Sequence, residues 1–186
     1  MPDRTFGPRI RLTATFVALV VISACTGHSG GDVASGTGCA YILGGVTSIV
    51  DPNCSPCSVA NQPAAADGDR TTYATVTVGP AVPGSSNSGV ALRAHAPSGT
   101  TYSSGSFPTF YFSAANGNWC WALITYRNGA PASSGPQFNS CQSDSNGSGY
   151  NSQSTSNPFD AVEVVITSNQ AVGNVSVQIN EICSNN

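Results

Sequence analysis

From Cys39 onward the chain consists of short runs rich in Val, Ile, Thr, Tyr and Phe, separated by clusters of Gly, Pro, Asn and Ser. No segment of this part shows the apolar period of about 3.6 residues that marks an amphipathic helix. Short runs bounded by turn residues are typical of β-strands. We therefore expect an all-β antiparallel sandwich of seven or eight strands. The expected strands lie near residues 40–50, 71–78, 88–96, 107–113, 118–127, 161–168 and 173–182.

One turn in this pattern is specific. Asn128-Gly129 follows the run Trp121–Arg127, and both residues accept the positive φ angles of a two-residue hairpin turn. We expect the segments on its two sides to be antiparallel neighbours. Two longer connections, residues 79–88 and 131–158, have lengths that are typical of functional or mobile loops.

The first 24 residues are typical of a bacterial export signal. Three arginines precede the apolar segment Leu12–Ile22, which is too short to span a bilayer, and Ser23-Ala24-Cys25 follows. The run LVVISAC resembles the lipobox of bacterial lipoproteins, which implies removal of residues 1–24 and attachment of diacylglycerol and an acyl chain such as palmitate to Cys25. The alternative is an ordinary signal peptide in which Cys25 has no role.

The lipobox resemblance predicts a protein of the bacterial cell envelope that contacts the membrane through its lipid anchor, in the outer membrane if the cell is Gram-negative. Anchoring by more than one acyl chain is durable. Residues 25–38 are rich in Gly and Ser, which predicts a flexible tether. We expect residues 39–186 to form one folded domain. Without residues 1–24 the chain has three arginines, no lysine and eight acidic residues, a formal net charge of −5. This balance disfavours nucleic acid as a partner.

Six cysteines remain after Cys25, and an even number in an exported chain indicates up to three disulfides. Cys39 and Cys183 stand at the two ends of the folded region, which favours a bridge between them. Cys54 and Cys57, in CSPC, fit a local structural disulfide better than a redox motif or a zinc half-site, because no βαβ pattern and no metal-site spacing surrounds them. Cys120 and Cys141 then remain, and a bridge between them would hold the long polar loop.

The segment ADGDRTTYATV, residues 66–76, places two carboxylates and two hydroxyls in a turn that leads into a strand. Hard cations such as calcium bind converging oxygen ligands, and glycine lets the chain curl around the ion. The alternative is an Asx-type turn that needs no metal.

This segment resembles the DGxxxT motif of discoidin-like, galactose-binding-like jelly rolls, a group that includes carbohydrate-binding modules. CSPCSVANQ before it, and TYRNG, NPFDAVEVVITS and VSVQINEIC after it, follow in the order seen in such domains of bacterial cell-surface proteins. The similarity covers roughly residues 39–183. It implies an antiparallel jelly-roll β-sandwich for residues 39–186.

The resemblance also implies a structural calcium site. In calcium-binding relatives two acidic turn residues, a threonine, a carbonyl before the turn and a glutamate on the last strand surround the ion. The corresponding residues here are Asp67, Asp69, Thr72, Ala65 and Glu181. Relatives often carry Trp after the Thr-aromatic pair, where this chain has Ala74, so the resemblance does not define a ligand specificity.

Trp119 and Trp121 form the densest aromatic point of the chain, and strand alternation places both on one face with Leu123. Such a pair either packs in the core or forms a ligand-binding platform that stacks against sugar rings. The platform alternative predicts that these two residues bind glycan.

Few residues of the chain fit a catalytic role. The folded part has one histidine, His95, and no nucleophile elbow, and the carboxylates of Asp160 and Glu163 are the nearest imitation of a glycosidase pair. We therefore predict a surface-anchored, non-catalytic binding module with glycan as the leading ligand class. The alternative is a structural or protein-adhesion lipoprotein that has no small-molecule site.

Overall fold

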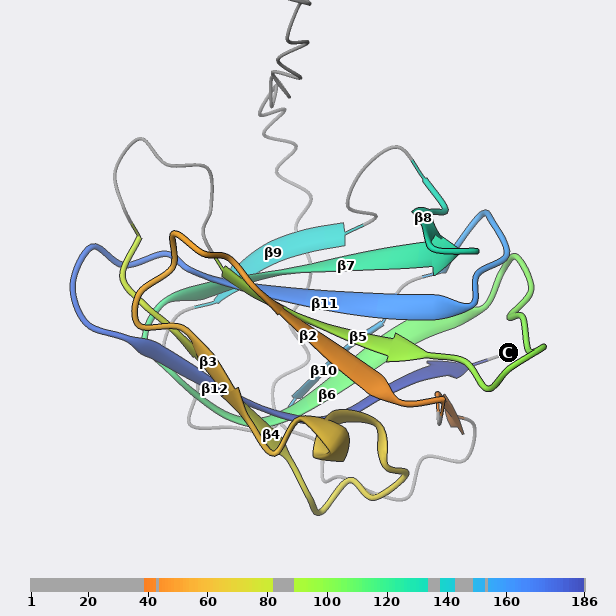
Figure 1. Ribbon diagram of the computed structural model, residues 1–186, viewed down its shortest axis with the longest axis horizontal. Helices are drawn as coiled ribbons and strands as arrows, with labels where there is room; N and C mark the ends of the chain where they lie inside the picture. Colours follow the sequence, from red (N-terminus) through yellow and green to blue (C-terminus); the bar gives the residue numbers. More distant parts are fainter. Residues whose placement is uncertain are drawn as a thin grey trace, which may run out of the picture.

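The computed structural model describes residues 39–42, 44–81, 89–133, 138–142, 149–152 and 154–185. The expected signal peptide, Cys25 and the tether lie outside the described residues. Two antiparallel sheets pack face to face (Figure 1). The predicted all-β antiparallel jelly-roll sandwich is confirmed. No helix among the described residues is both long and apolar enough to cross a membrane.

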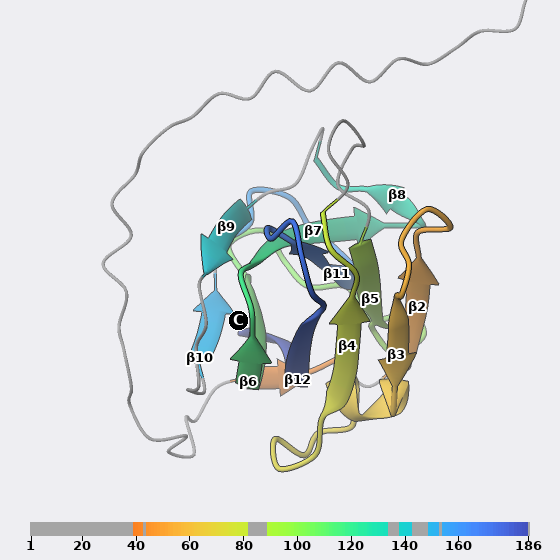
Figure 2. The same cartoon turned by 90° about the vertical axis from the view of Figure 1, so that its left-hand side faces the viewer.

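The first sheet has the order β10-β6-β12-β4-β3, with β1 also paired to β12, and the second has the order β2-β5-β11-β7-β8, with β9 also paired to β7. The first sheet contains β1 (Cys39–Tyr41), β3 (Ser58–Ala60), β4 (Ala74–Val78), β6 (Phe107–Asn116), β10 (Gly149–Ser152) and β12 (Val175–Asn185). The second contains β2 (Val46–Val50), β5 (Gly89–His95), β7 (Trp119–Arg127), β8 (Ala130–Pro131), β9 (Phe138–Gln142) and β11 (Ala161–Ser168). Figure 2 shows β10, β6, β12 and β4 in this order from one side.

Period-two alternation decides which side chains fill the space between the sheets. In β4, Ala74, Val76 and Val78 are buried, whereas the two threonines between them are partly exposed. In β5, Val90, Leu92 and Ala94 are buried in the same way. Successive side chains of a strand point to opposite faces of the sheet, so one residue set builds the core and the other builds the outer surface.

Four aromatic rings join the two sheets in the core. Phe110 of β6 meets Trp121 of β7 edge to face, with ring centroids 5.3 Å apart. Phe112 meets Trp119 in the same manner at 5.4 Å. Edge-to-face pairs stabilise beyond the area that they bury.

This packing corrects the expectation that Trp119 and Trp121 form a ligand-binding platform. Trp119 is fully buried and Trp121 is 6% exposed. Both face inward with Leu123, as the alternation predicted, but the inner face is covered by the phenylalanines of the opposite sheet. A ring enclosed in this way has no free face for a sugar, so the core alternative is the observed one.

The Asn128-Gly129 hairpin is confirmed. Asn128 has φ 51° and Gly129 has φ 79°, and the turn joins β7 to its antiparallel neighbour β8. The backbone N–H of Asn128 also donates to an oxygen of Asp160 at 2.8 Å. Asp160 therefore ties this turn to the start of β11.

Two of the predicted disulfides are present, Cys54–Cys57 and Cys120–Cys141. Cys183 is buried and disulfide-bonded. The backbone of β1 pairs with the end of β12, with Tyr41 opposite Cys183, so the two ends of the fold are neighbours. The side chain of Cys39 lies outside the described residues, and its bridge to Cys183 stays a prediction.

The aromatic contact between the sheets predicts a strong dependence of stability on Trp119. We expect Trp119→Ala to lower the free energy of unfolding by about 3–5 kcal/mol, because it leaves a large cavity. Urea denaturation followed by circular dichroism measures the change. Tyr73→Ala, at an exposed ring, is the control and should stay within about 0.5 kcal/mol of wild type. Equal stability of the two variants would contradict the packing described.

Candidate functional site

The segment from Asp67 to Thr72 forms a compact turn after η1 (Gln62–Ala66). Gly68 has φ 84°, a left-handed conformation that glycine adopts without strain. An Asp67 oxygen accepts the Asp69 N–H at 2.9 Å, and an Asp69 oxygen accepts the Thr71 N–H at 2.8 Å. These are two successive Asx turns. The turn is therefore closed by its own hydrogen bonds without a metal ion, as the Asx-turn alternative predicts.

Side-chain hydroxyls add to the turn. The Thr71 hydroxyl donates to the same Asp69 oxygen at 2.7 Å, and together with the Thr71 N–H it lowers the pKa of Asp69. The Thr72 hydroxyl lies 2.7 Å from the second Asp67 oxygen and 2.9 Å from the Asp69 carbonyl. Carboxylate, hydroxyl and carbonyl oxygens thus gather within one short segment.

Glu181 comes to this turn from the last strand. β12 shifts register against β6 on both sides of Ile179, and Asn180 and Glu181 are both buried. One Glu181 oxygen, Oε2, accepts the Gly68 N–H at 3.1 Å. The other oxygen, Oε1, is buried and has no hydrogen-bond partner among the described residues. A buried polar atom without a partner is unfavourable, and Oδ1 of the neighbouring residue Asn180 is in the same situation.

Burial raises the pKa of Glu181 to about 8. The Gly68 N–H and the charge of Arg70 act against this shift, whereas the charges of Asp67 and Asp69 add to it. Without a cation beside it, Glu181 is therefore mostly protonated at neutral pH. A bound cation would compensate its negative charge and return the pKa to a low value.

Asn180 and Arg70 hold the outer part of this turn. The Asn180 amide donates to the carbonyls of Arg70 at 3.0 Å and Thr72 at 3.1 Å. The Arg70 guanidinium lies 3.8 Å above the ring of Tyr111 on β6. These contacts fix the turn against β12 and β6, so the position of the Asp67 and Asp69 oxygens does not depend on the turn alone.

The structure brings four of the five predicted calcium ligands together. Asp67, Asp69 and Thr72 share the turn, and Glu181 reaches it from a position 113 residues further on. Ala65 is fully buried in η1, which leads directly into Asp67. No group of three or more His, Cys, Asp or Glu side chains in the described part of the chain is arranged to hold a metal ion. A cation here would need the hydroxyl and carbonyl oxygens as well, a donor set that fits calcium.

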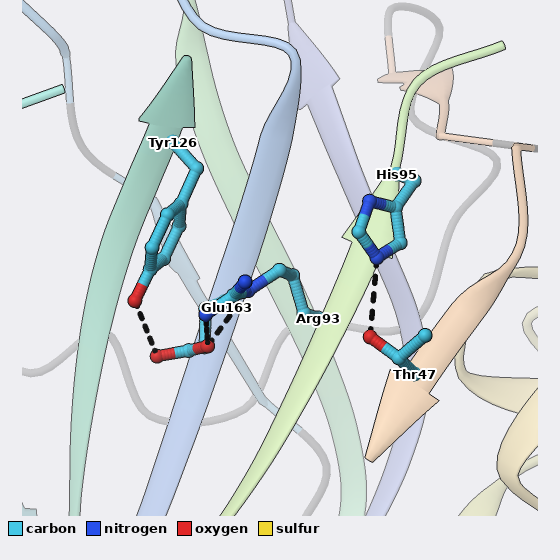
Figure 3. A network of polar contacts seen from close by, with 5 residues as sticks. All are labelled: Thr47, Arg93, His95, Tyr126 and Glu163. Atoms are coloured by element: carbon cyan, nitrogen blue, oxygen red, sulfur yellow. Dashed lines mark hydrogen bonds and ion pairs between the residues drawn. The ribbon is translucent and has the colours of Figure 1, made fainter. Parts of the chain in front are cut away.

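A second polar cluster lies on the outer face of the other sheet (Figure 3). Arg93 on β5 donates from Nε and Nη2 to Oε2 of Glu163 on β11, at 2.8 and 2.6 Å. The Tyr126 hydroxyl on β7 donates to Oε1 of Glu163 at 3.1 Å, and the Arg93 guanidinium lies 3.7 Å from the centre of the Tyr126 ring. We call Arg93, Glu163 and Tyr126 the outer triad.

The outer triad is unusually buried for a surface cluster. Glu163 is 5% exposed, and the side chain of Arg93 is 20% exposed. Burial, followed by the charge of Glu163, raises the pKa of Tyr126. Because both carboxylate oxygens are engaged and the guanidinium is stacked, the three side chains hold one another in fixed positions.

A row of apolar side chains runs beside the outer triad. The strand register aligns Ile49, Ala91, Val165 and Ala122 across β2, β5, β11 and β7. Their sequence neighbours Val90, Val164 and Trp121 face the core, so this apolar row faces outward. His95 lies on the same face, and its Nε2 is 3.1 Å from the Thr47 hydroxyl (Figure 3). The face thus combines small apolar side chains with fixed polar groups.

The residues considered for catalysis have separate partners. Asp160 accepts the Asn128 N–H, Glu163 belongs to the outer triad, and His95 contacts Thr47. In the sequence, Glu163 stands out only as an imitation of a catalytic acid, and neither Arg93 nor Tyr126 stands out as a functional residue. Strand alternation places each of these three residues on the face opposite the core-facing residues of its strand, but which of them meet depends on the strand order.

No protein-family model matches the chain, and no curated protein sequence matches it. Fifteen chains of known structure do. One is the family 32 carbohydrate-binding module of NanJ from C. perfringens in complex with galactose, with 11% identity and a TM-score of 0.49 over 79% of this chain and 97% of that chain.

Two further structures show similar coverage. The family 32 module of AlyQ in complex with 4,5-unsaturated mannuronic acid has 13% identity and a TM-score of 0.43, over 77% of this chain and 95% of its own. The K3 cleaved adhesin domain of Lys-gingipain from Porphyromonas gingivalis has 11% identity and a TM-score of 0.42, over 77% and 97%. At these identities the likeness concerns the fold.

The raised pKa of Glu181 predicts the pH dependence of the metal-free protein. The unfolded chain ionises this carboxyl near pH 4.5, whereas the folded chain does so only near pH 8. The contribution of Glu181 to stability therefore falls as the pH rises from about 4.5 to about 8, by an amount of the order of several kcal/mol. We expect Glu181→Gln, which resembles the protonated carboxyl, to match wild type near pH 4.5 and to exceed it at pH 8. Urea unfolding in chelator at both pH values measures this, and parallel pH profiles would contradict the buried carboxyl.

Proposed function

We propose that this protein is an exported, lipid-anchored, non-catalytic module that binds glycan, and that a calcium ion stabilises its fold. The observation that carries the proposal is the outer face of the β2-β5-β11-β7 sheet, where the outer triad and the apolar row lie side by side. The lipid anchor in this proposal rests on the LVVISAC segment alone.

The two parts of this face match the two surfaces of a sugar ring. A pyranose presents a flat face of C–H groups and a rim of hydroxyls. Ile49, Val165 and Ala122 of the apolar row offer a low surface for the C–H groups, and Ala91 between Ile49 and Val165 is only 8% exposed. Arg93 uses two of its five N–H donors on Glu163 and keeps the others for sugar hydroxyls. Because these groups are already held in place, binding loses little conformational entropy.

Contact with another surface protein is the second candidate function. Ile49 and Val50 are 49% and 41% exposed on β2, which ends its sheet. An edge strand with exposed apolar side chains can pair with a strand of a partner. This candidate would use the edge of the sheet, whereas glycan binding would use its outer face.

The calcium part of the proposal rests on the partnerless Oε1 of Glu181. Asp67, Asp69, Thr72 and Glu181 would hold the ion, with the carbonyl of Ala65 as a further ligand. Bound calcium would supply positive charge and coordinate oxygens, with no part in bond making or breaking. The ion would join the turn to the last strand, and its role would be structural.

Calcium should stabilise the protein through this site. At a hundredfold excess over its Kd, calcium adds about 2.7 kcal/mol to the free energy of unfolding, which corresponds to an increase of about 5–10 °C in Tm. Calorimetry with calcium and with chelator measures the shift. Glu181→Gln should lose most of it, whereas Asp51→Asn, in an Asx turn elsewhere, should keep it. A Tm that calcium does not change would contradict the site.

The glycan proposal is tested with a glycan array in the presence of calcium. We expect wild type to bind a subset of glycans, and Ala122→Glu in the apolar row to weaken that binding at least tenfold. Thr75→Glu is the matched control, because Thr75 is a partly exposed position of β4 on the other sheet; it should bind like wild type. A folded wild-type protein that binds no glycan would contradict the proposal and favour the protein-contact candidate.

A further inference from the structure

We infer that Glu163 sets the charge class of the ligand, so that the outer face accepts neutral glycans and rejects glycans that carry carboxylates. This inference rests on the proposed glycan binding. In the outer triad the positive charge of Arg93 is already neutralised by Glu163. Glycan binding in general does not require this neutralisation, so it points to a selection by ligand charge.

The geometry shows how completely the charge is matched. Both guanidinium contacts, at 2.8 and 2.6 Å, go to the same oxygen of Glu163. The second oxygen accepts the Tyr126 hydroxyl, so the carboxylate is held from two sides. Glu163 is 5% exposed. Little water therefore screens its charge from a group that binds against Arg93.

A ligand carboxylate on Arg93 would lie beside the carboxylate of Glu163. Two like charges at such a distance in a partly buried place repel each other, and one guanidinium cannot fully compensate both. A sugar hydroxyl meets no such repulsion. It can accept a remaining Arg93 N–H without bringing a second negative charge beside Glu163.

Among the described residues, the nearest other ionisable groups do not change this balance on the outer face. His95 lies beyond Arg93 on β5 and is hydrogen-bonded to Thr47. Arg127 lies at the hairpin end of β7, one residue after Tyr126, and alternation sends its side chain to the other face of the sheet. Within the described part of the chain, the Arg93–Glu163 pair therefore determines the charge that a ligand meets over the middle of the outer face.

The test removes one charge while keeping the shape. Glu163→Gln retains an oxygen acceptor for Arg93 but frees the positive charge. The probes are uronic-acid oligosaccharides and the same oligosaccharides after reduction of their carboxyl groups, so that each pair differs only in charge. We expect wild type to prefer the reduced, neutral member at least tenfold. Glu163→Gln should gain at least tenfold in affinity for the acidic member, and this gain should decline with salt.

Tyr126→Phe is the control, because it removes a hydrogen bond to Glu163 and leaves both charges. It should keep the preference for neutral probes. The double variant Arg93→Gln/Glu163→Gln removes both charges, and an ion pair replaced as a unit generally leaves a folded protein. It should bind acidic and neutral members about equally, which keeps the inference testable if Glu163→Gln alone does not fold.

The outcomes separate the two proposals. Wild type that binds acidic probes as tightly as neutral ones, or a folded Glu163→Gln with an unchanged preference, overturns this inference and leaves glycan binding in place. Wild type that binds no glycan of either kind overturns the proposed function and this inference with it.

Discussion

The edge-to-face contacts between the phenylalanines of β6 and the tryptophans of β7 are the interaction on which the rest of the structure depends. They join the two sheets through the centre of the core. Once these rings face inward, alternation assigns every neighbouring position on β5, β7 and β11 to the core or to the outer surface. The orientation of Arg93, Tyr126 and Glu163 toward the outside follows from this packing.

The outer triad contains an ion pair, Arg93–Glu163, that lies on the outer face of a sheet but is largely shielded from water. Desolvation of two charges is unfavourable, and their mutual attraction and the stacking on Tyr126 offset it only when the geometry is good. Such a pair adds little to the stability of a sandwich with an aromatic core. The proposed binding role would explain why fixed donors and acceptors lie beside the apolar row.

The Asp67 turn and Glu181 form a second polar cluster of a different kind. The turn satisfies its own hydrogen bonds, as an Asx turn does, but one oxygen of the buried Glu181 has no partner among the described residues. Without a metal ion, burial raises the pKa of Glu181 to about 8, so its carboxyl is mostly protonated at neutral pH. The proposed cation would bind the partnerless oxygen and would join the first third of the domain to its last strand.

The sequence by itself determined the segments of β4, β5, β6, β7, β11 and β12, the Asn128-Gly129 hairpin and the local Cys54–Cys57 bridge, because period-two alternation, positive φ angles and short loops are local properties. It did not predict β3, β9 and β10, and the single strand expected near residues 40–50 is two strands, β1 and β2, in different sheets. It also placed Trp119 and Trp121 on one face, but not on which side of the sandwich. Only the tertiary structure decided that these rings are buried and that Arg93 meets Glu163, 70 residues away. Such pairings depend on strand order and register, which arise when distant segments pack together to exclude water, and no local pattern encodes them.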